Sequence, residues 1–362
     1  MKLDVAYWIF NYMPHWEAAS KEAQTLLHAL NGKFRSQLFS LNQSYRIALR
    51  GQEKYLPLPA ALPALPLLDQ LARRHRINHL FSSAGERLLM PFVSKRDSLI
   101  TICKEAISVD AFERNRHHLA RFRFVVVESE RHQEILQQCG IEERRIRLIY
   151  PPATVTPYRA AQPPFKVLFA SSPTRRGKLL SRGLFLILSA AERLRDVRFI
   201  LVWRKRDHDA LRDLIERHRV DNISVINHYV DDMGILYDSA HVTILPGLDH
   251  ASFKPAPQSA LDSLGHGKPV LVTPTTSIAN LVAQRGCGIV FEPTVSGFEN
   301  AVREAMVRYD ELQRRCHAVV QACFSREAFV RGYELLYEDL LQGAPVKCAP
   351  RSSRARGTPT LG

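Results

Sequence analysis

Two charged side chains, Lys254 and Asp262, stand eight residues apart ahead of the run Gly267-Lys-Pro-Val. An aspartate can accept hydrogen bonds from two hydroxyl groups at once, and a lysine places a positive charge beside an anion. Gly267 fits the residue that follows the C-terminus of a helix, and Pro269 begins the next strand. The pattern predicts that Asp262 lies on a short helix over residues 258–266, where it can bind a small polar ligand.

A second group of candidate ligands follows the strand predicted at residues 166–170. Ser172, Arg175 and Arg176 lie in the loop, and Arg182 precedes the glycine that opens the next helix. Backbone amides and the dipole at a helix N-terminus attract anions, and arginine adds fork-shaped donors. The loop therefore predicts a phosphate site with Arg182 as its main ligand. An arginine that only caps the helix at the surface is the alternative interpretation.

Three hydroxyl side chains, Thr275, Thr276 and Ser277, precede a helix predicted at residues 278–284. Serine and threonine are preferred at the residue before a helix, so Thr276 or Ser277 is expected to cap it. Ligand binding is the secondary expectation for this group.

The run from Lys254 to Val270 resembles the donor-site signature of the retaining glycosyltransferases of family four. In that family an acidic residue, seven others and a glutamate lead into a helix that ends at Gly-x-Pro-Val. Asp262 stands at the glutamate, so the resemblance implies that it binds the ribose hydroxyls of a nucleotide. Lys254 replaces the first acidic residue, which faces the donor sugar, and a lysine there suits the diphosphate or an acidic sugar. Arg182 stands where a lysine binds the donor diphosphate, and residues 275–277 stand where the family has a glycine-rich turn.

The resemblance implies the GT-B fold: two doubly wound, Rossmann-like α/β domains face a cleft, and the C-terminal helix crosses back to the first domain. It implies a hexosyltransferase that moves a sugar from a nucleoside-diphosphate sugar to a glycan or lipid-linked acceptor, with retention of anomeric configuration. Lys254 and Arg182 would be the catalytic residues, because fixed cations stabilise the charge that develops on the leaving diphosphate. No metal and no cofactor besides the donor are expected. The acidic pair Asp207 and Asp209 is interpreted as a helix cap.

The elements that must position these residues alternate between short β-branched strands and helices, which is typical of parallel sheets. In the second half, strands are expected at residues 166–170, 198–203, 223–227, 242–245, 269–273 and 288–291. In the first half, strands are expected at residues 3–10, 36–41, 78–81, 98–103, 124–127 and 146–149.

Proline-rich sequence between these two halves predicts a linker. The expected organisation is a first domain at 1–152, a linker at 153–164, a second domain at 165–324, a crossover helix at 325–342 and a disordered tail at 343–362. The tail combines glycine, proline, serine and arginine with almost no apolar content, and such a segment cannot form a core.

Composition is that of a globular enzyme, since 46% of the 362 residues are hydrophobic and 24% are charged. The six cysteines include no Cys-x-x-Cys pair, which argues against a zinc site and favours a reducing cytoplasm. No secretory signal or window of about 20 apolar residues is apparent. The net charge of +14 is compatible with anionic substrates, or with peripheral contact to an anionic membrane at its inner face. No nucleic-acid-binding module is recognised.

Two rival functions remain open at this point. A catalytically silent homologue that binds a nucleotide or glycan is favoured by Lys254 and by the first-domain loops, which depart from the family pattern. A nucleotide-sugar 2-epimerase shares the fold and would need carboxylate and histidine pairs, for which His15, Glu17 and Glu105 are candidates. A nicotinamide-dependent oxidoreductase is disfavoured because no Gly-x-Gly-x-x-Gly follows the early strands.

Overall fold

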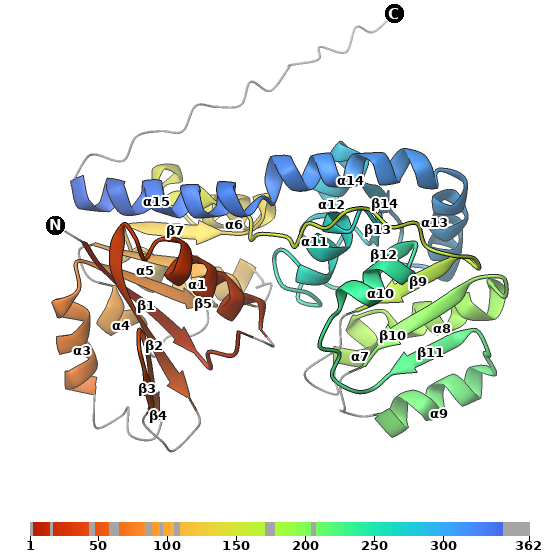
Figure 1. Cartoon of the computed structure of the whole chain (residues 1–362), viewed down its shortest axis with the longest axis horizontal. Coiled ribbons are helices and arrows are strands. Elements are labelled where there is room, and N and C mark those ends of the chain that lie inside the picture. The colour runs from red at the N-terminus through yellow and green to blue at the C-terminus, as the bar shows by residue number, and fades with distance from the viewer. Residues whose placement is uncertain are drawn as a thin grey trace, which may run out of the picture.

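The structure is a computed structural model that describes residues 3–14, 17–42, 48–57, 65–83, 89–94, 97–104, 109–170, 178–203 and 208–342. Its strands form two sheets, each flanked by helices, so that two α/β units lie side by side (Figure 1). Figure 1 shows the first unit in red to yellow and the second in green to blue. This arrangement confirms the predicted fold of two doubly wound units.

The first sheet has the strand order β3-β4-β2-β1-β5-β6-β7-β8, and only the β3–β4 pair is antiparallel. Side chains alternate along β1, so Val5 and Tyr7 enter one core and Ala6 and Trp8 enter the core on the other face. The strands are β1 (Leu3–Phe10), β2 (Phe34–Asn42), β3 (Ala48–Arg50), β4 (Glu53–Pro57), β5 (Ile77–Ser82), β6 (Ser98–Ile102), β7 (Phe124–Val127) and β8 (Ile146–Leu148). The helices are α1 (Ala18–Ala29), α3 (Leu65–Arg74), α4 (Met90–Val93), α5 (Val109–Leu119) and α6 (Glu130–Gln138), with a 3₁₀ turn at Glu143–Arg145.

The second sheet has the order β11-β10-β9-β12-β13-β14, and all of its pairs are parallel. Its strands are short, and the central strands are mostly buried, as expected of a sheet that helices cover on both faces. They are β9 (Lys166–Phe169), β10 (Arg198–Val202), β11 (Ile223–Ile226), β12 (Val242–Leu245), β13 (Val270–Val272) and β14 (Gly288–Val290). The helices are α7 (Lys178–Ser181), α8 (Leu184–Arg193), α9 (His208–His218), α10 (Gly234–Ser239), α11 (Gln258–Gly265), α12 (Ala279–Arg285), α13 (Val295–Val307) and α14 (Tyr309–Cys323).

The last helix, α15 (Arg326–Gln342), returns to the first unit, where Figure 1 shows it lying along the sheet. Phe329, Tyr333 and Tyr337 are buried in the same core as β1 and α1. The Tyr337 hydroxyl lies 2.7 Å from Nδ1 of the buried His79 on β5. These contacts confirm the predicted crossover helix.

The connection between β8 and β9 carries no helix or strand and runs against α11. The Thr156 amide donates to the carbonyl oxygen of Gly265 at 3.1 Å. A Cβ added at Gly265 would lie 2.0 Å from the carbonyl oxygen of Thr154, so only glycine allows this close approach. The connection is therefore held against the second unit, and the domain boundaries drawn around it stay a prediction.

The predicted strands all occur, and their bounds differ by at most two residues from those in the structure. The β3–β4 hairpin was not predicted. Among the described residues, no helix has the length and apolar character needed to cross a bilayer. The expected disordered tail at 343–362 lies outside the described residues.

Candidate functional site

Two adjoining cavities open where the strands of the second sheet end. Their volumes are about 480 Å³ and about 270 Å³. Lys21 of α1 lines both, so the cavities lie between the second sheet and the first unit. The residues that line both are Lys21, Val202, Met233, Tyr237 and Asp262. Because ligands of doubly wound sheets bind outside the carboxyl ends of the strands, this is the candidate site.

Arg182 lines the smaller cavity near the start of α8, and its predicted role as a phosphate ligand stays a prediction. Its guanidinium carbon lies 5.4 Å from the centre of the Phe253 ring, within the range of a cation–π contact. The next residue, Gly183, has φ 74°, and a Cβ there would lie 2.0 Å from the carbonyl oxygen of Pro246. This close contact, which glycine alone permits, fixes Arg182 at the end of β12.

Asp262 lines both cavities from α11, whose opposite face buries Leu261 and Leu264 in the core. Its Oδ1 accepts hydrogen bonds from Nε2 of Gln258 at 2.9 Å and from the amide of Thr154 at 3.2 Å. Burial raises the pKa of the Asp262 carboxyl group, and these two hydrogen bonds oppose that rise. The side chain is therefore fixed in orientation before any ligand binds.

Lys254 also lines the smaller cavity, but its ammonium group already lies against two carboxyl groups. Nζ donates to Oε1 of Glu22 at 2.9 Å and lies 3.4 Å from Oε2 of Glu128. Burial alone would lower the pKa of Lys254, yet the carboxylates of Glu128 and Glu22 outweigh it and raise that pKa above its ordinary value. The predicted anion ligand is thus neutralised by residues of the first unit.

The sequence did not identify Lys21, Glu22 and Glu128 as site residues. Glu22 follows Lys21 on α1, and Glu128 follows β7 directly. The sequence did contain one indication of acidic partners: Lys254 stands in place of the family's acidic residue, and such a lysine requires a nearby negative charge. The partner Glu22 lies 232 residues from Lys254, and no local pattern could select it among the other acidic residues.

The larger cavity is lined by the loop between β11 and α10, which carries His228, Tyr229, Asp231 and Asp232. Oδ1 of Asp232 accepts a hydrogen bond from the Gly234 amide at 2.8 Å, which holds the loop at the start of α10. The wall thus combines an aromatic ring, an imidazole and carboxylates.

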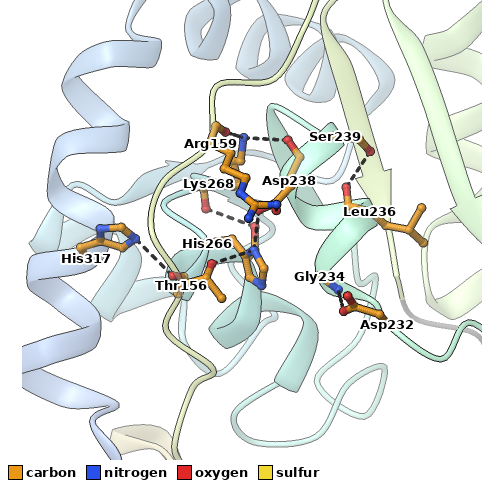
Figure 2. Close-up of polar contacts among 12 residues, drawn as sticks. Thr156, Arg159, Asp232, Gly234, Leu236, Asp238, Ser239, His266, Lys268 and His317 are labelled. Atoms are coloured by element: carbon orange, nitrogen blue, oxygen red, sulfur yellow. Dashed lines mark hydrogen bonds and ion pairs between the residues drawn. The ribbon is translucent and has the colours of Figure 1, made fainter.

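A polar cluster that includes Thr156, Asp238 and His266 lies along the wall of the larger cavity (Figure 2). Nδ1 of His266 lies 2.7 Å from Oδ1 of Asp238 and 3.0 Å from the hydroxyl of Thr156. Lys268 donates to the carbonyl oxygens of Arg159 at 2.6 Å and Asp238 at 3.1 Å. Burial lowers the pKa of Lys268 to about 8, although the Asp238 carboxylate opposes this. The cluster ties the connection to the second sheet.

The three hydroxyl side chains of residues 275–277 do not cap a helix as the sequence had predicted. Helix α12 begins after Ile278 with no side-chain cap, so the predicted cap by Thr276 or Ser277 is wrong. The Thr275 hydroxyl donates instead to the carbonyl oxygen of Gly247 at 2.7 Å, and the Thr276 hydroxyl donates to that of Leu245 at 3.4 Å. These residues line neither of the two cavities. Their secondary role in ligand binding stays a prediction.

Several predicted residues fall outside the described ranges: Ser172, Arg175, Arg176, Asp207, His15 and Glu105. Their expected roles stay predictions. In the described part of the chain, one group of metal-ligating side chains has its ligand atoms within 4.8 Å of one another, namely Glu22, Cys103 and Glu128. The ammonium of Lys254 lies against this group and supplies a positive charge there. The expected independence from metal also stays a prediction.

The family model described as "Glycosyl transferases group 1" matches residues 167–307, which hold the second sheet and most of the site. This match confirms the resemblance of the donor-site region. No curated protein is significantly similar to the chain in sequence.

Several solved structures share the fold over almost the whole chain. A glycosyltransferase from Rickettsia africae is 13% identical with a TM-score of 0.73, covering 95% of this chain and 100% of that one. Anabaena HepE in complex with UDP is 12% identical with a TM-score of 0.74, covering 94% and 100%. A UDP-forming α,α-trehalose-phosphate synthase from Burkholderia vietnamiensis is 11% identical with a TM-score of 0.68, covering 95% and 100%. The family match and the shared fold together support glycosyl transfer as the general activity.

Proposed function

We propose that this chain, whose second unit matches the group 1 glycosyltransferases and whose fold is theirs, transfers a sugar from a nucleoside-diphosphate sugar to a glycan or lipid-linked acceptor. The anomeric configuration is retained and no metal is required. The observation that carries this proposal is the meeting of Arg182, Lys254 and Asp262 around one cavity at the carboxyl ends of the second sheet. All three were selected from sequence alone.

In this proposal Asp262 binds the ribose hydroxyls and Arg182 binds the diphosphate. Transfer breaks the bond between the anomeric carbon and the diphosphate oxygen, and that oxygen leaves with the electron pair. The acceptor hydroxyl oxygen forms the new bond to the anomeric carbon, and its proton passes to the leaving diphosphate oxygen. Negative charge grows on the leaving diphosphate, so the guanidinium of Arg182 stabilises the transition state more than the bound donor. Lys254 lies at the same wall, where Glu22 and Glu128 offset its charge, so a catalytic part for this lysine requires that one of them turns away.

The proposal is tested by nucleotide binding. Thermal shifts with UDP, GDP, ADP and CMP, with and without magnesium, should show stabilisation by one diphosphate. UDP is the first choice, because HepE was solved with UDP and the trehalose-phosphate synthase is UDP-forming. Asp262→Ala should lose the shift, whereas Glu216→Gln, an exposed change on α9, should keep it. Absence of a shift with every nucleotide would contradict the proposal.

The silent homologue is the second candidate, and a specific observation favours it. The charge of Lys254 is neutralised by Glu22 and Glu128, so the family's acidic residue near the donor sugar has no counterpart at this position. Donor hydrolysis separates the two candidates. An active enzyme releases nucleoside diphosphate from the sugar nucleotide that stabilises it, and a silent one binds without release. The epimerase is a weaker alternative and would convert the donor without an acceptor.

We further propose that the enzyme works in the cytoplasm, in peripheral contact with the inner face of a membrane. The net charge of +14 supports attraction to anionic lipid. Sedimentation with vesicles should show binding to anionic lipid at low salt and no binding to neutral vesicles. Equal recovery with both kinds of vesicle would contradict this part of the proposal.

A further inference from the structure

The buried ion cluster of Lys254, Glu22 and Glu128 joins the two units of the molecule. Glu22 and Glu128 belong to the first unit and are 2% and 1% exposed, whereas Lys254 belongs to the second and is 17% exposed. Lys254 thus contacts the carboxylates on one side and the smaller cavity on the other. The Lys254 side chain therefore forms both a contact between the units and part of the cavity wall.

The negative charges of Glu22 and Glu128 are balanced by the positive charge of Lys254. Oε1 of Glu22 accepts a hydrogen bond from the Lys254 ammonium at 2.9 Å, and Oε2 of Glu128 lies 3.4 Å from the same group. Burial, followed by the neighbouring Glu22 carboxylate, raises the pKa of Glu128 well above its ordinary value, and Lys254 opposes this rise. Buried carboxylates without a cation are strongly unfavourable, because they lose water without gaining a partner.

Each of the three charges is favourable only in the presence of the other two. An acidic residue at position 254, as in the family signature, would face two buried carboxylates and repel them. A lysine there would be equally unfavourable without Glu22 and Glu128. When the units meet, the attraction between Lys254 and the two carboxyl groups offsets the water that these groups lose, and this attraction is lost when the units separate.

We propose that Glu22 and Glu128 are positioning residues that hold the Lys254 ammonium at the wall of the smaller cavity and thereby latch the two units together. The cluster of these three residues is called the latch below. This proposal concerns the closure of the cleft and not the reaction. It can therefore be tested independently of the proposed glycosyl transfer. Closure assembles the cavity, because its lining includes Lys21 of the first unit as well as Arg182 and Asp262 of the second.

The test measures the distance between the units and does not need a ligand. Dyes attached to one exposed position in each unit report that distance by energy transfer, and small-angle scattering reports the radius of gyration. Lys254→Met keeps the length of the side chain and removes its charge. We expect reduced energy transfer and a larger radius of gyration for this variant.

The matched control is Lys33→Met. Lys33 is an exposed lysine that pairs with Glu334 and Glu338 of α15, so its loss removes ion pairs without touching the cleft. This variant should keep the wild-type distance and radius.

A charge exchange tests the pairing directly. Glu22→Lys alone places two lysines against Glu128, and Lys254→Glu alone places three carboxylates together. Each should open the cleft, and the double variant should restore closure, with a coupling of about tenfold or more in the closure equilibrium. Because a single charge variant can misfold, the neutral triple variant with Glu22→Gln, Glu128→Gln and Lys254→Met is measured beside them. It leaves no buried charge and should fold with an open cleft.

Folding is checked by circular dichroism before any distance is interpreted. The latch is overturned if the folded Lys254→Met or neutral triple variant keeps the wild-type distance and radius. It is also overturned if the charge exchange shows no coupling. A failure of every nucleotide to bind, by contrast, would count against the proposed function and leave these distances unaffected.

Discussion

The backbone amide of Thr154 donates a hydrogen bond to Oδ1 of Asp262 at 3.2 Å. Thr154 belongs to the connection between the two units, and Asp262 is the residue proposed to bind the ribose. The side chain at the centre of the proposed donor site is therefore oriented by the segment that links the units.

Two substitutions distinguish the role of Asp262 in nucleotide binding from its role as the hydrogen-bond partner of Thr154. Asp262→Asn keeps an oxygen that can accept from Thr154 but loses the charge, so nucleotide affinity should fall about tenfold while thermal stability changes little. Asp262→Ala should also lower the free energy of unfolding by about 1 kcal/mol, because the Thr154 amide loses its partner. Calorimetric titration and urea unfolding measure the two effects. Equal affinity in all three proteins would exclude Asp262 from the site.

Arg182 is expected to act through its planar guanidinium. Arg182→Lys keeps one positive charge but loses the fork of donors and the contact with Phe253. The kcat of sugar transfer should fall about 10- to 100-fold, an effect of about 1.4 to 3 kcal/mol on the barrier. Arg193→Lys at the C-terminal end of α8 is the control, because this exposed arginine contacts Glu299 and not the cavity. Similar kcat values for the two variants would refute the assignment.

Gly183 should tolerate no side chain. Gly183→Ala combines φ 74° with a Cβ that would lie 2.0 Å from the carbonyl oxygen of Pro246. We expect a loss of more than about 1 kcal/mol in the free energy of unfolding, and weaker diphosphate binding because Arg182 shifts with the start of α8. Gly32→Ala meets nothing within 4 Å and should change stability little. A Gly183→Ala protein as stable as wild type would show that this turn can relax.

Stability should fall in mild acid, partly because of His132. Burial, followed by the charges of Arg131 and His250, lowers the pKa of His132 from 6.5 to about 4. Between these values the unfolded chain binds a proton that the folded protein does not, so stability is full above pH 6.5 and declines as the pH falls toward 4. The slope is at most about 1.4 kcal/mol per pH unit for this group. Urea unfolding across this range should show a shallower decline for His132→Gln, and an unchanged slope would contradict the assignment.

Local sequence predicted the strands well, because runs such as Phe124–Val127 and Val242–Leu245 are β-branched or apolar throughout and are bounded by polar residues or proline. Both of these strands have the predicted bounds in the structure. The β3–β4 hairpin was missed, since its two short segments form an edge pair without a continuous apolar run.

The site was predictable where its residues are close in sequence and not where they meet only in the folded chain. Arg182 directly precedes Gly183 at the start of α8, Asp262 lies five residues before Gly267, and both line the smaller cavity. The expected cap at Thr276 failed because a carbonyl oxygen at the end of a neighbouring strand offered its hydroxyl another partner. Glu22 and Glu128 could not be selected, because their partner Lys254 is brought to them only by the packing of two units.

The return of α15 to the first sheet also affects how the chain folds as it is made. The core shared by β1, α1 and α15 lacks Phe329, Tyr333 and Tyr337 until the last part of the sequence leaves the ribosome. At about 5–20 residues per second, the roughly 200 residues between β7 and α15 take on the order of 10–40 s to synthesise. The part of this face that α1 does not cover therefore stays exposed during that time, and we expect the nascent chain to bind chaperones that shield apolar strands.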